Sequence, residues 1–400
     1  MSPIPMTGQE RVRDAMNLQK ADRVPVFCQL ATGHYFLYSG LQPLDIWLRS
    51  EGFADALVAL QRRYRFDGIL VNLPGRDPEF EKQIERIDRH QADRETWIRW
   101  RNGNYTRVPD DDNPHYFQSD GTRYFPSFDE VDPEALWYVE PWDLTDITYP
   151  YTWSFEKEPR PFDDFFPSYQ EDTIRLVKEK VAGSVSVHSE IFSPFSQFLE
   201  LLNYEYALMG LLDDPGKSHA MLERLTLGAI DLGKRQAAAG VDAVLISSAF
   251  AGGGLISRND YEIFVLPYEK KLIDEIHAEY PNVKIYTHTC GAIGDRLDLM
   301  LRTGSEGIDT LDPPPLGTVE LEEAIPTLQG KAFIKGNIDP VHTLLYGNEQ
   351  TVREAVAERL RIAKPGGGYI LSTACSVAPA VKPELIETMS ALTHELGRYD

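Results

Sequence analysis

Short runs of apolar residues recur along the chain, and polar residues at helical spacing separate each run from the next. Eight runs have the length and composition of buried strands, at residues 24–30, 66–73, 184–188, 243–247, 283–288, 307–311, 331–335 and 368–372. Runs that are apolar at successive positions are typical of strands covered on both faces. Eight strands alternating with helices predict an α/β protein with a (β/α)8 TIM barrel. A doubly wound sheet is the alternative, because the pattern does not show closure.

The alternation stops between Trp97 and Tyr169, where no further strand–helix unit is evident. This stretch holds 19 of the 43 aromatic residues, and residues 97–108 have the pattern of a β-hairpin with a two-residue turn at Asn102-Gly103. We therefore expect a single barrel domain over residues 1–400, with an aromatic-rich insertion at about 90–170 after the second strand. The aromatic side chains either form a small satellite core or line a pocket for a planar substrate.

Charge and cysteine content narrow the class of protein. The 62 acidic residues outnumber the 40 basic ones, and the net charge of −22 argues against nucleic acid or an anionic membrane as partner. Three cysteines are too few for a disulfide scaffold, and Cys28 falls inside a predicted strand, where it is expected to pack in the core. The first residues do not resemble a signal peptide and no apolar run reaches transmembrane length, so we expect a soluble, cytoplasmic protein.

Polar and reactive residues gather at the ends of the predicted strands. In a TIM barrel the carboxyl ends of the strands carry the active site. These ends carry Gln29, Asn72, His188 with Glu190, Ser247, His288 with Cys290, Asp312, Asn337 and Cys375. We therefore expect these side chains to meet at one mouth of the barrel.

The pair His288 and Cys290 is the strongest candidate for metal chemistry. The two residues stand two positions apart on extended backbone, so their side chains point the same way. With Cys375 they supply three nitrogen and sulfur ligands, and three ligands with an open fourth position describe a catalytic zinc ion. Asp312 and Glu190 are the candidates for a displaceable fourth ligand. The alternatives are that the pair faces a packed core and that Asp312 only caps the turn into three prolines.

Several short motifs are spread over most of the chain. They are Gln9-Glu10-Arg11-Val12, His288-Thr289-Cys290-Gly291, Gly336-Asn337-Ile338-Asp339-Pro340, and Cys375 with Lys382-Pro383-Glu384. Together they resemble the uroporphyrinogen decarboxylase superfamily. They look most like its zinc-dependent, cobalamin-linked methyltransferases, which include the methylcobamide:coenzyme M enzymes. The resemblance implies a (β/α)8 barrel, zinc held by His288, Cys290 and Cys375, and an acidic residue near Asp312 that gives way to substrate.

The chain departs from the decarboxylases at two places where those enzymes bind substrate. Residues 29–35 carry no arginine where the decarboxylases have an arginine-bearing stretch, and Asn72 stands where they have an aspartate. The resemblance therefore implies a methyltransferase that moves a methyl group between a small molecule and a corrinoid (cobalamin), which is carried by a corrinoid partner protein or free. Catalytic roles are predicted for Asp312, Glu190 and His188.

The aromatic-rich insertion favours a methoxylated aromatic compound as the methyl donor, in an O-demethylation. Transfer from a methylcobamide to a thiol acceptor is one alternative, and a uroporphyrinogen-type decarboxylation is another. A non-catalytic binding protein would instead hold a structural zinc ion with four closed protein ligands. A homodimer is compatible with the sequence.

Overall fold

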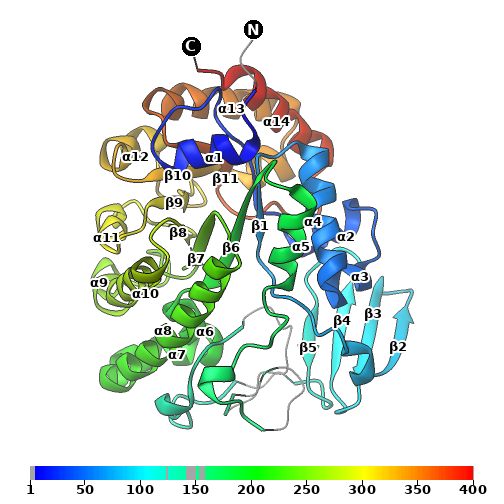
Figure 1. The fold of residues 1–400 in the computed structure, drawn as a ribbon. Helices are drawn as coiled ribbons and strands as arrows, with labels where there is room; N and C mark the ends of the chain where they lie inside the picture. Colours follow the sequence, from blue (N-terminus) through cyan, green and yellow to red (C-terminus); the bar gives the residue numbers. More distant parts are fainter. Residues whose placement is uncertain (1–4, 123–124, 141–149, 152, 154–157, 400) are drawn as a thin grey trace.

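The fold is that of a computed structural model, which describes residues 5–122, 125–140, 150–151, 153 and 158–399 (Figure 1). Its strands are β1 Gly68–Val71, β2 Ile84–His90, β3 Glu95–Trp100, β4 Tyr105–Pro109, β5 His115–Phe117, β6 Ser186–Phe192, β7 Ala243–Ser247, β8 Lys284–Thr289, β9 Gly307–Thr310, β10 Phe333–Ile338 and β11 Tyr369–Thr373.

The α-helices lie mainly between the strands of one sheet. They are α1 Gly8–Met16, α2 Thr32–Tyr38, α3 Pro43–Leu48, α4 Ser50–Tyr64, α5 Asp172–Val181, α6 Pro194–Leu202, α7 Tyr204–Asp213, α8 Pro215–Ala238, α9 Arg258–Phe264, α10 Leu266–Glu279, α11 Leu297–Arg302, α12 Leu321–Leu328, α13 Glu349–Ala363 and α14 Pro383–Leu396. Short 3-10 turns occur at η1 Phe80–Gln83, η2 Pro133–Ala135, η3 Phe162–Asp164 and η5 Lys364–Gly366, and a π turn at η4 Pro340–Leu345. None of the helices in the described residues is long and apolar enough to span a membrane.

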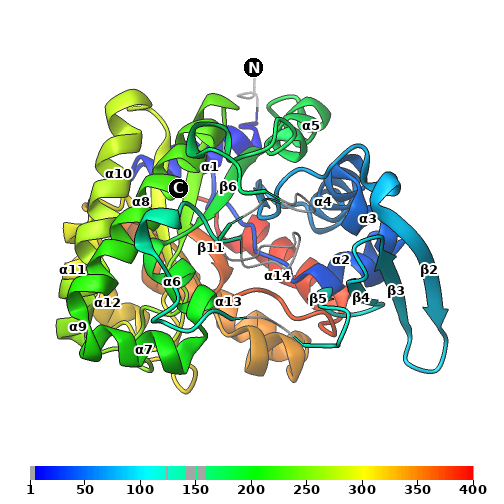
Figure 2. The same cartoon turned by 90° about the horizontal axis from the view of Figure 1, so that it is seen from below.

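Seven strands form one parallel sheet in the order β1-β6-β7-β8-β9-β10-β11. Each follows its neighbour in the chain through a connection that contains helices, and these helices surround the curled sheet when it is viewed from below (Figure 2). The strands are apolar at successive positions because helices cover the outer face and side chains fill the interior; all five residues of β7 are buried. The predicted α/β architecture with a parallel sheet is therefore confirmed.

The first predicted strand, at residues 24–30, is not a regular strand and requires a correction. Val26 forms an isolated parallel bridge to Leu371 of β11, and the N–H of Leu371 donates to the carbonyl of Pro25 (2.9 Å). On the other side, the N–H of Asp67 donates to the carbonyl of Val26 (2.8 Å). Proline has no N–H, so a continuous ladder cannot form here. The segment still connects the two edges of the seven-stranded sheet.

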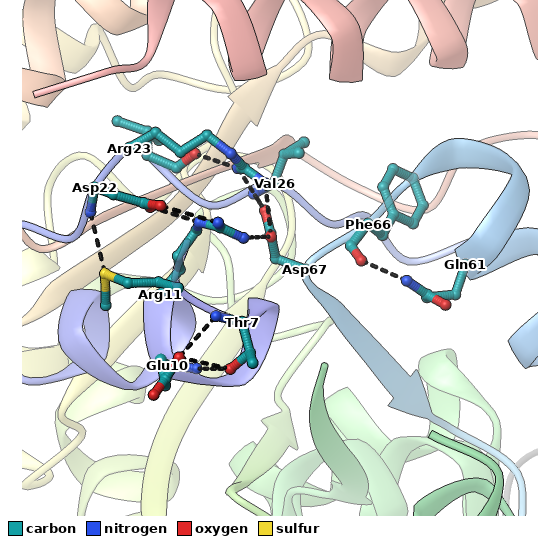
Figure 3. A network of polar contacts seen from close by, with 11 residues as sticks. Thr7, Glu10, Arg11, Asp22, Arg23, Val26, Gln61, Phe66 and Asp67 are labelled. Atoms are coloured by element: carbon teal, nitrogen blue, oxygen red, sulfur yellow. Dashed lines mark hydrogen bonds and ion pairs between the residues drawn. The ribbon is translucent and has the colours of Figure 1, made fainter. Parts of the chain in front are cut away.

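A buried carboxylate fixes this segment to the start of β1 (Figure 3). Asp67 accepts hydrogen bonds from Arg23 Nη1 (2.7 Å) and Nη2 (2.8 Å), from Arg11 Nη1 (3.2 Å) and from the main-chain N–H of Val26 (2.9 Å). Its side chain is only 3% exposed. Helix α1, residues 24–30 (the bridging segment) and β1 are therefore joined by one charged group.

Replacing Asp67 by asparagine is expected to lower the free energy of unfolding by about 3 kcal/mol, because two half-buried arginines lose their counter-charge. Asp22→Asn is the matched control, since Asp22 also pairs with Arg11 but is 39% exposed. An exposed pair contributes at most about 1 kcal/mol. Chemical denaturation of both variants checks the prediction, and equal losses would contradict it.

A second, antiparallel sheet has the order β2-β3-β4-β5 and follows β1 in the chain. It begins at Ile84, earlier than the predicted start of the insertion. Its β3–β4 hairpin lies at the predicted position, but the turn is different. Trp100 N–H donates to the Asn104 carbonyl (2.9 Å), so three residues rather than two form the loop. Gly103 takes the positive φ of 92° that this loop requires.

The described aromatic residues of the insertion largely pack against one another. Trp153, Phe165 and Phe166 are buried, with ring centroids 5.2–6.0 Å apart, and Tyr138 contacts Phe166. Among the described residues these side chains are continuous with the main hydrophobic core, so the separate satellite core that the sequence offered as one alternative does not form. Tyr124, Trp142, Tyr149 and Phe155 lie outside the described residues.

Candidate metal centre

Strand β8 brings His288 and Cys290 to one side of the sheet interior. His288 is buried near the end of the strand and Cys290 follows its last residue. Cys290 Sγ lies 3.3 Å from His288 Nε2 and 3.6 Å from Cys375 Sγ. The donor atoms of all three residues lie within 4.8 Å of one another, so the structure brings together the residues that were predicted as metal ligands.

These distances between donor atoms are those expected when the side chains bind one shared zinc ion. Zinc bonds sulfur at about 2.3 Å and nitrogen at about 2.0 Å, so tetrahedral ligands lie roughly 3.5–3.8 Å apart. The observed 3.3 Å and 3.6 Å differ from that range by a few tenths of an ångström at most. Cys28, the third cysteine, is buried in the core away from this cluster, as predicted.

Cys375 reaches the cluster from the edge strand β11. It lies two residues beyond β11, and the N–H of Ala374 donates to the carbonyl of Ile338 (2.8 Å) at the end of β10. Two residues further on, the N–H of Val377 donates to the carbonyl of Gln29 (2.9 Å). The loop that carries Cys375 is therefore held between β10 and the bridging segment.

His288, Asp309 and Lys335 form a row across β8, β9 and β10, because each is in register with the next. Asp309 Oδ2 accepts from His288 Nδ1 (3.1 Å), and Lys335 Nζ donates to both Asp309 oxygens (3.1 Å each). The side chains of Lys335 and Asp309 are 1% and 2% exposed. The carboxylate fixes the ring and leaves Nε2 facing the thiols.

Charge interactions set the protonation of these groups. Burial opposes a charge on Asp309, but the Lys335 ammonium lowers the pKa of its carboxyl group. Burial likewise opposes a charged His288, yet the contact with Asp309 raises the pKa of His288 to about 10. The hydrogen bond from Cys290 holds the pKa of the Cys375 thiol well below its ordinary value. The cluster therefore stabilises one thiolate, which is the form of cysteine that binds metals.

Asp312 lies next to the cluster but is not one of the three clustered residues. Its Oδ2 accepts from the main-chain N–H of Gly291 (2.5 Å), directly after Cys290. Burial raises the pKa of Asp312 to about 6. The carboxylate therefore binds the end of β8, and the alternative in which it caps its own proline turn does not describe the contact observed.

Glu190 lies within β6, because this strand continues to Phe192 and does not end at 188. Its carboxylate is buried, and Oε2 has no hydrogen-bond partner among the described residues. Burial raises the pKa of Glu190 to about 7, against the opposing influence of His288. Glu190 is therefore a buried acidic group with one oxygen that forms no hydrogen bond within the described part of the chain.

His188 lies deeper in the sheet than the cluster. Phe192 of β6 pairs with Ser247 of β7, which pairs with His288 of β8. His188 stands four residues before Phe192, so it lies roughly 13 Å back along the strand from the level of His288. Its Nδ1 contacts Tyr286 Oη (2.9 Å) and its Nε2 contacts Ser186 Oγ (3.1 Å). Both ring nitrogens are thus engaged by neighbouring side chains.

The sequence analysis missed Asp309 and Lys335. Both stand inside short apolar strands, where a charged residue requires a partner. Opposite charges in consecutive predicted strands are the signal that would have found them.

A curled parallel sheet with buried titratable side chains at its carboxyl ends is the architecture of an α/β enzyme. The profile of the uroporphyrinogen decarboxylase (URO-D) family matches residues 154–396, and the chain belongs to this family. A curated relative from Alkalilimnicola ehrlichii, named uroporphyrinogen decarboxylase, is 27% identical over 240 residues, which cover 58% of this chain and 63% of the relative.

A uroporphyrinogen decarboxylase from Prochlorococcus marinus is 31% identical over 186 residues, covering 46% of this chain and 51% of that protein. The matches thus span between half and two thirds of these relatives. The solved structure of a methyltransferase from Methanosarcina mazei has the same fold, with a TM-score of 0.68 at 17% identity, and the alignment covers 98% of this chain and 99% of that one.

Proposed function

We propose that this protein is a zinc-dependent methyltransferase that moves a methyl group between a small substrate and a corrinoid carried by a partner protein. The observation that carries the proposal is the cluster of His288, Cys290 and Cys375. It has the donor set and spacing of a three-ligand zinc site, next to the carboxyl ends of the strands. Three protein ligands leave a position at which substrate binds.

Bound there, zinc supplies a Lewis acid that keeps a thiol deprotonated near neutral pH or polarises an ether oxygen. Asp309 holds His288 in the tautomer that presents Nε2, and Lys335 balances the charge of Asp309. Asp312 and Glu190 are the proposed acidic residues beside substrate. The catalytic role predicted for His188 stays a prediction, and its two hydrogen bonds give it a supporting part in the interior.

Uroporphyrinogen decarboxylation is the second candidate, favoured by the names of the curated relatives. The charges around the cluster count against it. Asp309, Asp312 and Glu190 are acidic side chains, and the basic His288 and Lys335 are both already paired with Asp309. These basic groups are therefore not free to pair with the several carboxylates of a porphyrinogen.

A methoxylated aromatic compound is the favoured methyl donor, and a thiol acceptor is the alternative. The support for the aromatic donor is the aromatic-rich composition of residues 97–169, of which Trp153, Phe165 and Phe166 are buried in the hydrophobic core. We also infer that residues 24–30 take the place of the eighth strand and close the barrel. Residues 1–400 then form one domain, with the antiparallel sheet as its insertion.

Zinc-loaded protein mixed with cob(I)alamin is expected to take a methyl group from one of a panel of methoxylated aromatics and methylamines, or to transfer methyl from methylcobalamin to a thiol. The corrinoid absorption spectrum follows the reaction. Removal of zinc by a chelator should abolish the transfer, and added zinc should restore it. Metal-independent release of carbon dioxide from a porphyrinogen, without methyl transfer, would contradict the proposal.

A further inference from the structure

The two residues before Asp312 adopt a backbone conformation that side chains normally avoid. Thr310 has a φ of 81° and Leu311 a φ of 56°, both in the left-handed region. A β-branched residue such as threonine is rarely found there, because its Cβ crowds the main chain. Surrounding contacts must therefore hold this turn in place, and such conformations concentrate at functional sites.

Hydrogen bonds to both neighbouring strands hold the turn. Thr310 Oγ1 donates to the carbonyl of Thr289 (2.5 Å) at the end of β8. From β10, Asn337 Nδ2 donates to the carbonyl of Leu311 (2.8 Å). Gly336 allows the close approach, since a Cβ there would lie 2.5 Å from the carbonyl oxygen of Thr310.

The amide of Asn337 is itself oriented. Arg359 Nε donates to Asn337 Oδ1 (3.3 Å), which identifies that end of the amide as the oxygen. The nitrogen then faces the carbonyl of Leu311, and the side chain is fully buried. Asn337 therefore acts as a fixed donor whose only described target is the strained turn.

This turn determines where the carboxylate of Asp312 lies. Asp312 follows Leu311 directly and reaches the N–H of Gly291 (2.5 Å), the residue after the candidate ligand Cys290. Relaxing the left-handed pair would rotate the chain at Leu311 and withdraw the carboxylate from Gly291.

We propose that Asn337 and Thr310 are positioning residues that hold the carboxylate of Asp312 beside the candidate metal centre. The importance of this positioning for catalysis rests on the function proposed for Asp312. The positioning itself does not depend on a bound metal. The turn keeps an acidic group within reach of the open coordination position without making it part of the three-ligand cluster.

Amide hydrogen exchange at Gly291 in the metal-free protein measures the position of the carboxylate directly. Asp312→Ala sets the reference, because it removes the acceptor. Thr310→Val and Asn337→Leu are expected to accelerate exchange at Gly291 by about tenfold, as Asp312→Ala does. Thr310→Ser keeps the hydroxyl group and is expected to retain protection.

Thr226→Val is the matched control, because it removes a similar buried hydrogen bond, from Thr226 Oγ1 to the carbonyl of Leu222 (2.7 Å) in α8. It should leave exchange at Gly291 unchanged. Either variant of the turn suffices if the other does not fold. Wild-type protection at Gly291 in Thr310→Val and Asn337→Leu would overturn the proposal.

Cobalt in place of zinc provides the second readout. In Thr310→Val the visible spectrum of bound Co2+ is expected to shift as it does in Asp312→Ala, and the two substitutions combined should give no further shift. Independent, additive shifts would overturn the positioning role. A wild-type protein that binds no cobalt would contradict the proposed metal centre instead, and the exchange experiment would still decide the positioning role.

Discussion

Replacing Cys375 by serine is expected to weaken zinc binding by on the order of a hundredfold to a thousandfold. Structural zinc sites contribute about 10–16 kcal/mol from four ligands, so one thiolate contributes roughly 3–4 kcal/mol. Serine does not ionise near neutral pH and cannot replace the thiolate. Competition with a chromophoric chelator, together with the metal content of each purified chain, measures the loss.

The remaining cysteine provides the control for this experiment. Cys28 is buried in the core and outside the cluster, so Cys28→Ala removes a thiol without removing a ligand. Its zinc affinity should equal that of the wild type. Full zinc retention by Cys375→Ser, or equal losses in both variants, would remove the basis of the proposed metal centre.

Replacing Lys335 by methionine is expected to lower the free energy of unfolding by about 3–5 kcal/mol, because the buried Asp309 loses its lysine partner and keeps only His288. That loss is a large part of the 5–15 kcal/mol typical of a folded domain. The double variant Lys335→Met/Asp309→Asn is expected to recover part of the loss, since the buried charge that lost its lysine partner is gone. Urea unfolding of the metal-free proteins measures both.

Lys284→Met is the matched substitution, two strands away in β8. Lys284 also pairs with a carboxylate, Glu306 at 2.7 Å, but its side chain is 24% exposed and water screens the pair. Its removal should cost about 1 kcal/mol or less. Similar losses for the two lysines, or no recovery in the double variant, would show that burial does not govern the energy of the Lys335 pair.

The row of His288, Asp309 and Lys335 is also expected to affect the affinity for zinc. Asp309→Asn is expected to reduce zinc affinity by about 10–100-fold, because the partner of His288 no longer carries a charge. The effect should be smaller than that of Cys375→Ser, which removes a ligand outright. Zinc affinities of the same variants measured by chelator competition test this order, and the reverse order would contradict the supporting role of Asp309.

Much of the fold could be predicted because each parallel strand is a short apolar run between helices. Seven of the eight predicted runs overlap strands of the sheet. The run at residues 24–30 has the right composition and place, but Pro25 lacks the N–H that a regular ladder needs. Strand β2 was not predicted because its residues are mostly exposed. Without a buried face, the strand lacks the alternation of apolar and polar residues by which a strand is recognised.

The metal ligands could be predicted because histidine and cysteine are rare and stand at strand ends. The environment of the ligands could not, because it depends on register between distant strands. Asp309 meets both His288 and Lys335 only through the pairing of β9 with β8 and β10. The depth of His188 likewise follows from register, since the sequence does not say where β6 ends.

The separation of the ligands along the chain has a consequence for biosynthesis. Cys290 and Cys375 are 85 residues apart, and the second reaches the cluster only when β11 has paired with β10. At 5–20 residues per second, a ribosome needs roughly 4–17 s to add the missing donor. A nascent chain offers zinc only the His288 and Cys290 pair during that interval. We therefore expect metal loading to follow completion of the sheet, so that cells short of zinc accumulate folded, metal-free protein.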